Sequence, residues 1–240
     1  MQRNLRDLMD YKNVTVVLPT LNEEATIGLL IRYLIREYRG IRIIVVDDGS
    51  KDGTKKIVNR FSKRSVEFFD RHAAHLKRGL TFSIIDGILR AKTKYVIVMD
   101  ADLQHPPEKI KALAECLERG YDLAVAVRRT VKGWQFYRKL ISKTLIYIGY
   151  FILSIRGKSK CGDIFSGYFG VRRSMFSYIY KKNSERFVGE GYKVLFDLLK
   201  CIDKGSIRIC NVPFTFRLRK SGRSKAGLKQ GLALIKSFFS

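Results

Sequence analysis

The stretch YVIVMDADLQHPPEKIKALAECLERGYDLAVAV, residues 95–127, holds two apolar runs that flank a polar turn and a helical pattern. Residues 95–99 and 121–127 have the length and apolar character of buried strands, whereas apolar residues within 107–118 recur at helical spacing. Pro107 suits the first turn of that helix, where proline is tolerated. A strand, a helix and a second strand in this order predict one unit of a mostly parallel sheet.

The same alternation of strand and helix runs through the first 127 residues. We expect further strands at 14–18, 41–46 and 66–69, and further helices at 23–38, 52–61 and 80–91. Asp52 is expected to cap the second of these helices, because aspartate is favoured at that position. The alternation predicts an α/β fold in which helices cover both faces of the sheet.

Beyond residue 128 the pattern is less regular. We expect a long helical segment at 133–155, a strand within 165–173, a helix at 190–203, and two short strands separated by a proline within 206–216. A basic loop and then an amphipathic helix are expected within 217–239. We find no linker that would separate two independent domains.

The chain is strongly basic, with 47 Lys and Arg against 22 Asp and Glu, a net charge of +25. The excess is uneven: residues 1–122 carry 22 − 17 = +5, and residues 123–240 carry 25 − 5 = +20. Such a half-chain favours an anionic partner, either nucleic acid, an anionic membrane or a phosphate-bearing ligand. A purely solubilising role would not explain the asymmetry. Nucleic acid is disfavoured, because no helix-turn-helix, zinc or RNA-binding motif accompanies the charge.

The cysteines and the apolar segments indicate in which cellular compartment the protein resides. Cys116, Cys161, Cys201 and Cys210 form no C-x-x-C pair, and we interpret them as reduced residues of a cytosolic protein. The first thirteen residues lack the apolar core of a signal peptide. The longest apolar stretch, residues 144–155, is shorter than the roughly 20 residues that a membrane span needs.

Three polar clusters directly follow predicted strands. They are PTLNEE (19–24), DDGSKDGT (47–54) and DADLQH (100–105). Each cluster alone is compatible with a simple turn. In a parallel α/β sheet, however, ligands bind beyond the carboxyl ends of the strands, so the three together predict one site at one edge.

The third cluster offers oxygen ligands. Asp100, Asp102 and Gln104 suit Mg²⁺ or Mn²⁺, which share their coordination shells with ligand phosphates, and they suit zinc poorly. The alternative is that Asp102 caps the next helix, but it lies too far before residue 107 for a simple cap. Asp47 and Asp48 can accept hydrogen bonds from a base and a ribose; a plain turn is the alternative there, and the stretch alone does not decide.

The segments VVLPTLNEE (16–24), VVDDGSKDGT (45–54) and VMDADLQHPPE (98–108) resemble family 2 glycosyltransferases. Within that family the chain resembles dolichyl-phosphate mannose synthases and related polyprenyl-phosphate glycosyltransferases. The resemblance implies the GT-A fold, a Rossmann-like, mostly parallel sheet flanked by helices, with C-terminal amphipathic interfacial helices. It covers nearly the whole chain and implies a GT-A domain over 1–225, followed by an amphipathic helix at 226–240.

For the nucleotide-sugar half, residues 1–127, the resemblance implies a donor site and a divalent metal, Mg²⁺ or Mn²⁺. The implied nucleotide-sugar contacts are Pro19, Leu21, Glu23, Asp47, Asp48, Asp100, Ala101, Arg219 and Lys225. Leu21 stands where the family usually has Tyr, and Thr81 stands where its K-x-G-L-G segment has a second glycine. The implied metal ligands are Asp100, Asp102 and Gln104.

For the acceptor half, residues 128–225, the resemblance implies that Arg128, Arg138 and Ser142 bind a lipid phosphate. Asp102, Arg128 and Arg138 are the implied catalytic residues. Family members invert the anomeric centre by direct displacement. A phosphate monoester is already anionic near pH 7, its second pKa being about 6, so it needs positioning and not deprotonation. Residues 123–143 fit this, because they contain basic side chains and no acidic ones.

The resemblance implies GDP-mannose as donor and dolichyl or polyprenyl phosphate as acceptor, with no nucleic acid. UDP-glucose or another UDP-sugar stays open, as does a catalytically silent sugar-nucleotide sensor. Processive polysaccharide synthases are disfavoured, because Lys139 replaces the tryptophan of their Q-x-x-R-W motif.

A lipid acceptor also implies a peripheral protein at the cytoplasmic face of a membrane. Residues 133–155, with Trp134, Phe136, Tyr137 and Tyr147, then form an interfacial helix; an ordinary core helix is the alternative. Some family members continue into transmembrane helices. A naturally short form, a need for a membrane-anchoring subunit, and truncation are the open alternatives for this chain.

Overall fold

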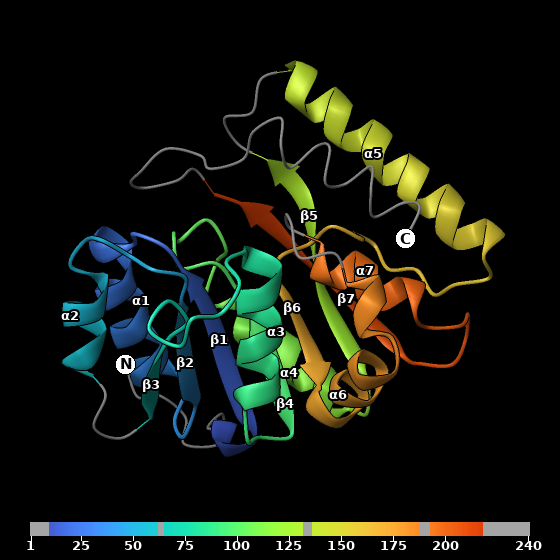
Figure 1. Ribbon diagram of the computed structural model, residues 1–240. Coiled ribbons are helices and arrows are strands. Elements are labelled where there is room, and N and C mark those ends of the chain that lie inside the picture. The colour runs from blue at the N-terminus through green and yellow to red at the C-terminus, as the bar shows by residue number, and fades with distance from the viewer. Residues whose placement is uncertain (1–9, 62–64, 132–135, 188–192, 218–240) are drawn as a thin grey trace, which may run out of the picture.

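The computed structural model describes residues 10–61, 65–131, 136–187 and 193–217, and the side chains of 130–143 lie outside that description. Its strands are β1 (Val14–Thr20), β2 (Arg42–Asp47), β3 (Val66–Asp70), β4 (Tyr95–Val98), β5 (Leu123–Val131), β6 (Phe169–Arg172) and β7 (Ile209–Phe216). They form a seven-stranded sheet in the order β3-β2-β1-β4-β6-β5-β7 (Figure 1).

Parallel pairing dominates this sheet. β1 pairs in parallel with β2 and β4, β2 with β3, and β5 with β7. Only β6, among the described strands, runs against its neighbours β4 and β5. The prediction of a mostly parallel sheet is confirmed.

Helices cover both faces of the sheet, as predicted. They are α1 (Glu24–Glu37), α2 (Thr54–Asn59), α3 (Leu80–Arg90), α4 (Lys109–Glu118), α5 (Phe136–Ile155), α6 (Arg173–Lys182) and α7 (Val194–Lys200), with short 3₁₀ helices at Tyr11–Asn13 and Ser184–Arg186. Successive side chains of a strand point to opposite faces. Val16 and Leu18 of β1 therefore pack with α1 and α4, whereas Val17 packs with α3, α6 and α7.

Two local predictions were wrong, and one helix was missed. β7 runs without interruption through Pro213, because it is the edge strand and proline is accepted where one side of a strand is unpaired. Helix α6 was not predicted. α2 begins at Thr54 with Gly53 at its cap position, although Asp52 still accepts a hydrogen bond from the Thr54 amide at 3.0 Å.

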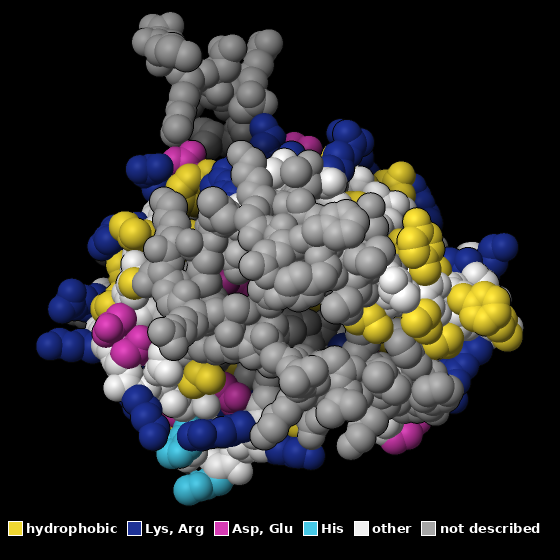
Figure 2. Space-filling view, turned by 90° about the horizontal axis from the view of Figure 1, so that it is seen from above, with side chains coloured by type: hydrophobic (Ala, Val, Ile, Leu, Met, Phe, Trp, Pro, Cys, Tyr) yellow, Lys and Arg dark blue, Asp and Glu magenta, His cyan; other side chains and the backbone are white. Residues whose placement is uncertain are grey.

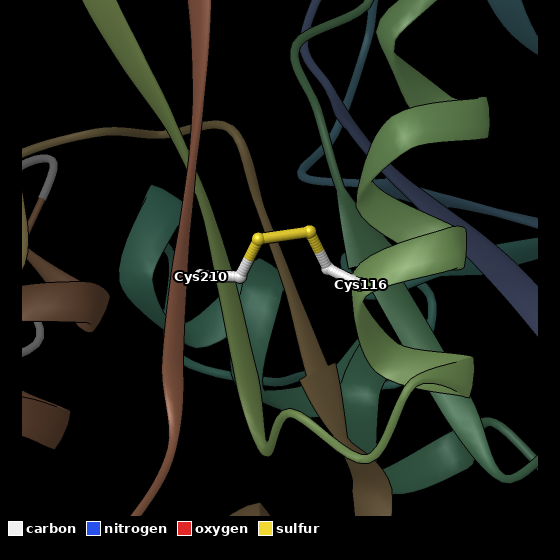
Figure 3. Close-up of a disulfide and its surroundings, with 2 residues drawn as sticks. All are labelled: Cys116 and Cys210. Atoms are coloured by element: carbon white, nitrogen blue, oxygen red, sulfur yellow. A yellow bond between two sulfur atoms is a disulfide. The ribbon is translucent and has the colours of Figure 1, made fainter.

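The prediction of reduced cysteines was wrong for two of the four. Cys116 of α4 and Cys210 of β7 form a disulfide (Figure 3). They are 94 residues apart in the chain, and their Cα atoms are brought to 6.2 Å by the packing of α4 against this end of the sheet. Cys161 and Cys201 are free, and burial raises the pKa of the Cys161 thiol to about 12.

Candidate active site

The three polar clusters meet at one edge of the sheet. Thr20 of β1 is in register with Asp47 of β2, and Val17 is in register with Val98 of β4. Because these strands are parallel neighbours, their carboxyl ends lie side by side. The arrowhead of β5 in Figure 1 marks this edge as the upper one, and Figure 2 views the molecule from that side.

The loop after β4 is closed on itself by His105. Nδ1 of His105 accepts a hydrogen bond from the Asp100 amide at 3.0 Å, and Oδ1 of Asp102 accepts one from the Gln104 amide at 3.0 Å. Leu103 adopts a left-handed conformation with φ of 63°, which tightens the turn. Burial lowers the pKa of His105 to about 4, so the ring is neutral at pH 7 and Nδ1 remains an acceptor.

Two tyrosines hold the prolines that follow. The Tyr168 hydroxyl donates to the Pro106 carbonyl at 3.1 Å, and the Tyr38 hydroxyl donates to the Pro107 carbonyl at 2.7 Å. The His105 ring stacks on Tyr168 with a centroid distance of 4.9 Å. The two prolines thus mark the point where the loop is anchored to the core before α4 begins.

The predicted metal ligands fit a hard divalent ion in their donor chemistry. Asp102 is buried, and Asp100 and Gln104 are half-buried. The Gln104 amide nitrogen donates to the Arg217 carbonyl at 3.1 Å, which leaves the amide oxygen as its potential ligand atom. Within the described residues, no group of three or more His, Cys, Asp or Glu side chains could hold a metal ion. Two carboxylates and one amide oxygen suit Mg²⁺ or Mn²⁺, which keep positions for phosphate and water.

Asp47 holds the turn after β2. It is buried, and its carboxylate accepts hydrogen bonds from the Gly49 amide at 3.0 Å, the Ser50 amide at 2.8 Å, the Ser50 hydroxyl at 2.5 Å and the Thr20 hydroxyl at 3.2 Å. Gly49 has a φ of 96°, which favours glycine there. The turn that the sequence left open as an alternative is therefore present, and a nucleotide contact by Asp47 stays a prediction.

Asp48 is held by a residue that sequence reasoning missed. Arg71, fully buried just after β3, forms an ion pair with Asp48 and a second with Asp86 at 2.7 Å. It also donates to the Lys77 carbonyl at 2.6 Å, while Asp48 accepts from the Gly79 amide at 2.8 Å. Arg71 thereby ties the turn after β2 to the segment that leads into α3.

The residues predicted after β1 lie at the same edge. Pro19 is buried within β1, and Leu21 and Glu23 are half-buried. The Glu23 amide donates to the Thr54 hydroxyl at 2.9 Å, which joins this segment to α2. Ala101 is buried in the loop after β4. The donor contacts of these residues stay predictions.

Arg128, near the end of β5, is held by Asp163. Its Nε and Nη2 atoms donate to the two carboxylate oxygens of Asp163 at 2.6 and 3.0 Å. Burial opposes the charge of Arg128, but the hydrogen bonds and charge of Asp163, together with the charge of Asp100, raise its pKa. Asp102, Arg128 and Asp163 in turn act electrostatically on His105. The structure therefore places Arg128 within electrostatic range of Asp100, one of the predicted metal ligands.

The remaining predicted residues lie wholly or in their side chains outside the described part of the chain. Arg138 and Ser142 belong to the first turns of α5, but their side chains lie outside the described residues. Arg219, Lys225 and the helix expected at 226–240 lie outside them as well. The described chain reaches Arg217, whose amide donates to the Gln104 carbonyl at 3.1 Å and whose guanidinium pairs with Glu108. Asp163 and Arg71 were missed because only long-range partners reveal their roles.

The sequence matches the model of the glycosyl transferase family 2 over residues 15–179. It is 35% identical to a dolichol-phosphate mannosyltransferase of Pyrococcus furiosus over 88% of this chain, and it spans 58% of that protein's length. It is 30% identical to the dolichol-phosphate mannosyltransferase of Saccharomyces cerevisiae and to a polyprenol monophosphomannose synthase of Mycolicibacterium smegmatis, over 88% of this chain and 80% and 79% of those proteins.

Solved structures share the fold. Glucosyl-3-phosphoglycerate synthase of Mycobacterium tuberculosis with phosphoglyceric acid superposes with a TM-score of 0.67 at 20% identity, over 95% of this chain and 80% of that one. The complex of the same enzyme with Mn²⁺, UDP-glucose and glycerol 3-phosphate gives a TM-score of 0.61 at 21% identity, over 88% and 73% of the two chains. The predicted fold class is confirmed for the described residues.

Proposed function

Since this chain belongs to glycosyl transferase family 2, we propose that it transfers mannose from GDP-mannose to a dolichyl or polyprenyl phosphate. The transfer inverts the anomeric centre, depends on Mg²⁺ or Mn²⁺, and takes place at a membrane surface. The relatives named as dolichol-phosphate and polyprenol-phosphate mannosyltransferases support the acceptor class.

The observation that carries the proposal is the arginine Arg128, held by Asp163, within electrostatic range of Asp100 in the loop after β4. Asp100 and Arg128 are close enough for the carboxylate to raise the pKa of the guanidinium. A divalent ion held by Asp100, Asp102 and Gln104 would stabilise the diphosphate as it leaves. Arg128 offers an anion site next to it, where the acceptor phosphate can be held for direct displacement.

The acceptor side needs no general base. A lipid phosphate already carries the nucleophilic oxygen in ionised form near pH 7. The protein's task is then to hold that oxygen in line with the anomeric carbon and to offset the repulsion between two anions. A guanidinium serves this task better than a carboxylate would.

The exposed face of α5 supports membrane contact. Tyr147, Phe151 and Ile155 are 71%, 66% and 70% exposed, and their spacing of four places them on one face of the helix. Figure 2 shows hydrophobic side chains gathered on the side of the molecule where α5 lies. Exposed apolar side chains on one helix face, followed by the exposed Arg156, fit an anionic lipid surface better than a core position.

This face supports a peripheral location, which we assign to the cytoplasmic side of the membrane. No helix among the described residues combines the length and the apolar character needed to cross a bilayer. A membrane-anchoring subunit belongs to the same proposal as one way of keeping the chain at the surface.

A UDP-sugar donor is the second candidate. The fold neighbour that is described with Mn²⁺ and UDP-glucose supports both a divalent ion and this alternative. In the present chain, the base would lie near Asp48, which retains acceptor positions for the N–H groups of either guanine or uracil. The donor panel below distinguishes the two donors.

A donor panel tests the proposal. GDP-mannose, UDP-glucose and UDP-N-acetylglucosamine are each incubated with a short polyprenyl phosphate and Mg²⁺ or Mn²⁺, and the glycolipid product is measured. We expect product with GDP-mannose, and loss of product in Asp100→Ala with Asp102→Ala. The control is Asp203→Asn, because Asp203 is an exposed carboxylate that pairs with Lys158. Transfer that survives the double substitution would contradict the metal-assisted mechanism.

A further inference from the structure

Arg128 does not stand alone at the acceptor side, because a buried carboxylate holds one edge of its guanidinium. Asp163 lies between α5 and β6, and its side chain is 5% exposed. We propose that Asp163 is a positioning residue that aims Arg128 at the acceptor phosphate. This inference rests on the proposed function, since it deepens the role of Arg128 in that reaction.

The geometry of the pair fixes the plane of the guanidinium. Arginine has five N–H donors in a rigid fork. The two contacts at Nε and Nη2, 2.6 and 3.0 Å long, engage one edge of the fork. Two hydrogen bonds to one carboxylate prevent the guanidinium from rotating, whereas a single hydrogen bond would let it turn about the contact. The edge that includes Nη1 is not engaged by Asp163, and it is the edge that can meet a phosphate.

The segment that carries Asp163 is itself held from three sides. The Ser166 hydroxyl donates to the Ala126 carbonyl of β5 at 2.7 Å, and the Gly162 amide donates to Oδ1 of Asn211 in β7 at 2.9 Å. The Tyr150 hydroxyl of α5 donates to the Cys161 carbonyl at 2.7 Å. Asp163 is therefore fixed relative to the sheet and to α5, so it can determine where Arg128 points.

A role as general base does not fit this arrangement. In the proposed reaction an oxygen of the lipid phosphate forms a bond to the anomeric carbon while the bond to the nucleotide diphosphate breaks. No proton has to leave the acceptor, so the step balances without a base. Both oxygens of Asp163 are also committed to Arg128, and proton uptake would break the ion pair.

A double-mutant cycle tests the inference, with Arg128→Ala, Asp163→Asn and both together. Loss of hydrogen bonds to a charged group changes affinity on the order of 10- to 100-fold. We expect Asp163→Asn to raise the KM for short polyprenyl phosphate by about that factor, and to add nothing in the Arg128→Ala background. Asp163→Glu, which keeps the charge, is expected to lie between Asp163→Asn and the unsubstituted protein.

The readouts separate positioning from folding and from base catalysis. Nucleotide binding is expected to match that of the control Asp203→Asn, and the pH–rate profile is expected to keep its shape. The thermal midpoint is expected to fall below that of the control, because the Arg128 guanidinium loses its buried counter-charge. A further tenfold loss of rate when Asp163→Asn is added to Arg128→Ala would show that Asp163 acts on its own. An Asp163→Asn variant indistinguishable from Asp203→Asn would equally overturn the inference.

Failure of the proposed function would look different. Binding of the short polyprenyl phosphate is measured by calorimetry apart from turnover. Unsubstituted protein that binds this phosphate but transfers no sugar would contradict the proposed reaction. The double-mutant cycle, measured in binding affinity, would then still test whether Asp163 positions Arg128. Protein that binds no polyprenyl phosphate would overturn both.

Discussion

Arg71→Met removes the cation at the centre of the buried cluster that joins the turn after β2 to α3. Arg71 is 1% exposed and pairs with Asp48 and Asp86, whose side chains are 13% and 31% exposed. Loss of one member of a buried ion pair costs about 3–5 kcal/mol, because a charge is left uncompensated. Asp86 is partly hydrated and contributes less, so we expect the free energy of unfolding to fall by about 3 kcal/mol.

The assay is urea unfolding followed by circular dichroism, with Arg186→Met as the matched control. Arg186 pairs with Glu185 at 3.9 Å, and the two side chains are 48% and 70% exposed. Exposed pairs of this kind contribute about 1 kcal/mol or less. The affinity for GDP is measured in parallel, since Asp48 loses its anchor. A fall of less than 1 kcal/mol for Arg71→Met, with unchanged GDP affinity, would refute the role assigned to this cluster.

Reduction of the bond between Cys116 and Cys210 is expected to lower the free energy of unfolding by about 2–4 kcal/mol, measured by urea unfolding with and without reductant; Cys116→Ser should remove the effect of the reductant. The pKa of His105 falls from 6.5 unfolded to about 4 folded. Between these values the unfolded chain binds more protons, so metal-free protein should lose about 3 kcal/mol of stability as the pH falls through this window, and His105→Asn should show less of this loss. Phe151→Ser on the exposed face of α5 should weaken binding to anionic vesicles in a sedimentation assay, whereas Tyr178→Ser, equally exposed on α6, should not; equal losses would contradict the membrane assignment.

The parts of the fold that the sequence predicts are those with strong local signals. The β-branched runs of β1, β2 and β4 stand out because buried parallel strands are apolar on both faces. The helix α6 was missed because its sequence, RSMFSYIYKK, is rich in aromatic residues that favour strands, and its packing on β6 and α3 overrides that preference. Pro213 misled for a related reason, since only the strand order shows that β7 lies at an edge.

Within the site, the sequence located the carboxylates but not what holds them. Asp100, Asp102 and Gln104 can be predicted as ligands because they occur at every second residue directly after a strand. The partners Arg71 and Asp48 are 23 residues apart, and Arg128 and Asp163 are 35 apart, so no local spacing announces them. The disulfide was missed in the same way. Pairs of residues that are far apart in the chain can be identified only once the fold has shown that they lie close together.

The uneven charge of the chain acquires a physical meaning if the proposed reaction holds. After β4 the chain places the carboxylates of Asp100 and Asp102, although the proposed donor is anionic. That arrangement is favourable only when a divalent ion stands between carboxylate and diphosphate. In the proposed reaction the acceptor phosphate meets Arg128 directly, and Asp163 offsets part of that charge without reaching the acceptor. The reaction brings two anions together, the donor diphosphate and the acceptor phosphate. A metal ion would offset the repulsion between the diphosphate and the carboxylates, and a guanidinium would attract the acceptor phosphate. The basic excess therefore belongs in the half that receives the lipid phosphate, which is where the sequence has it.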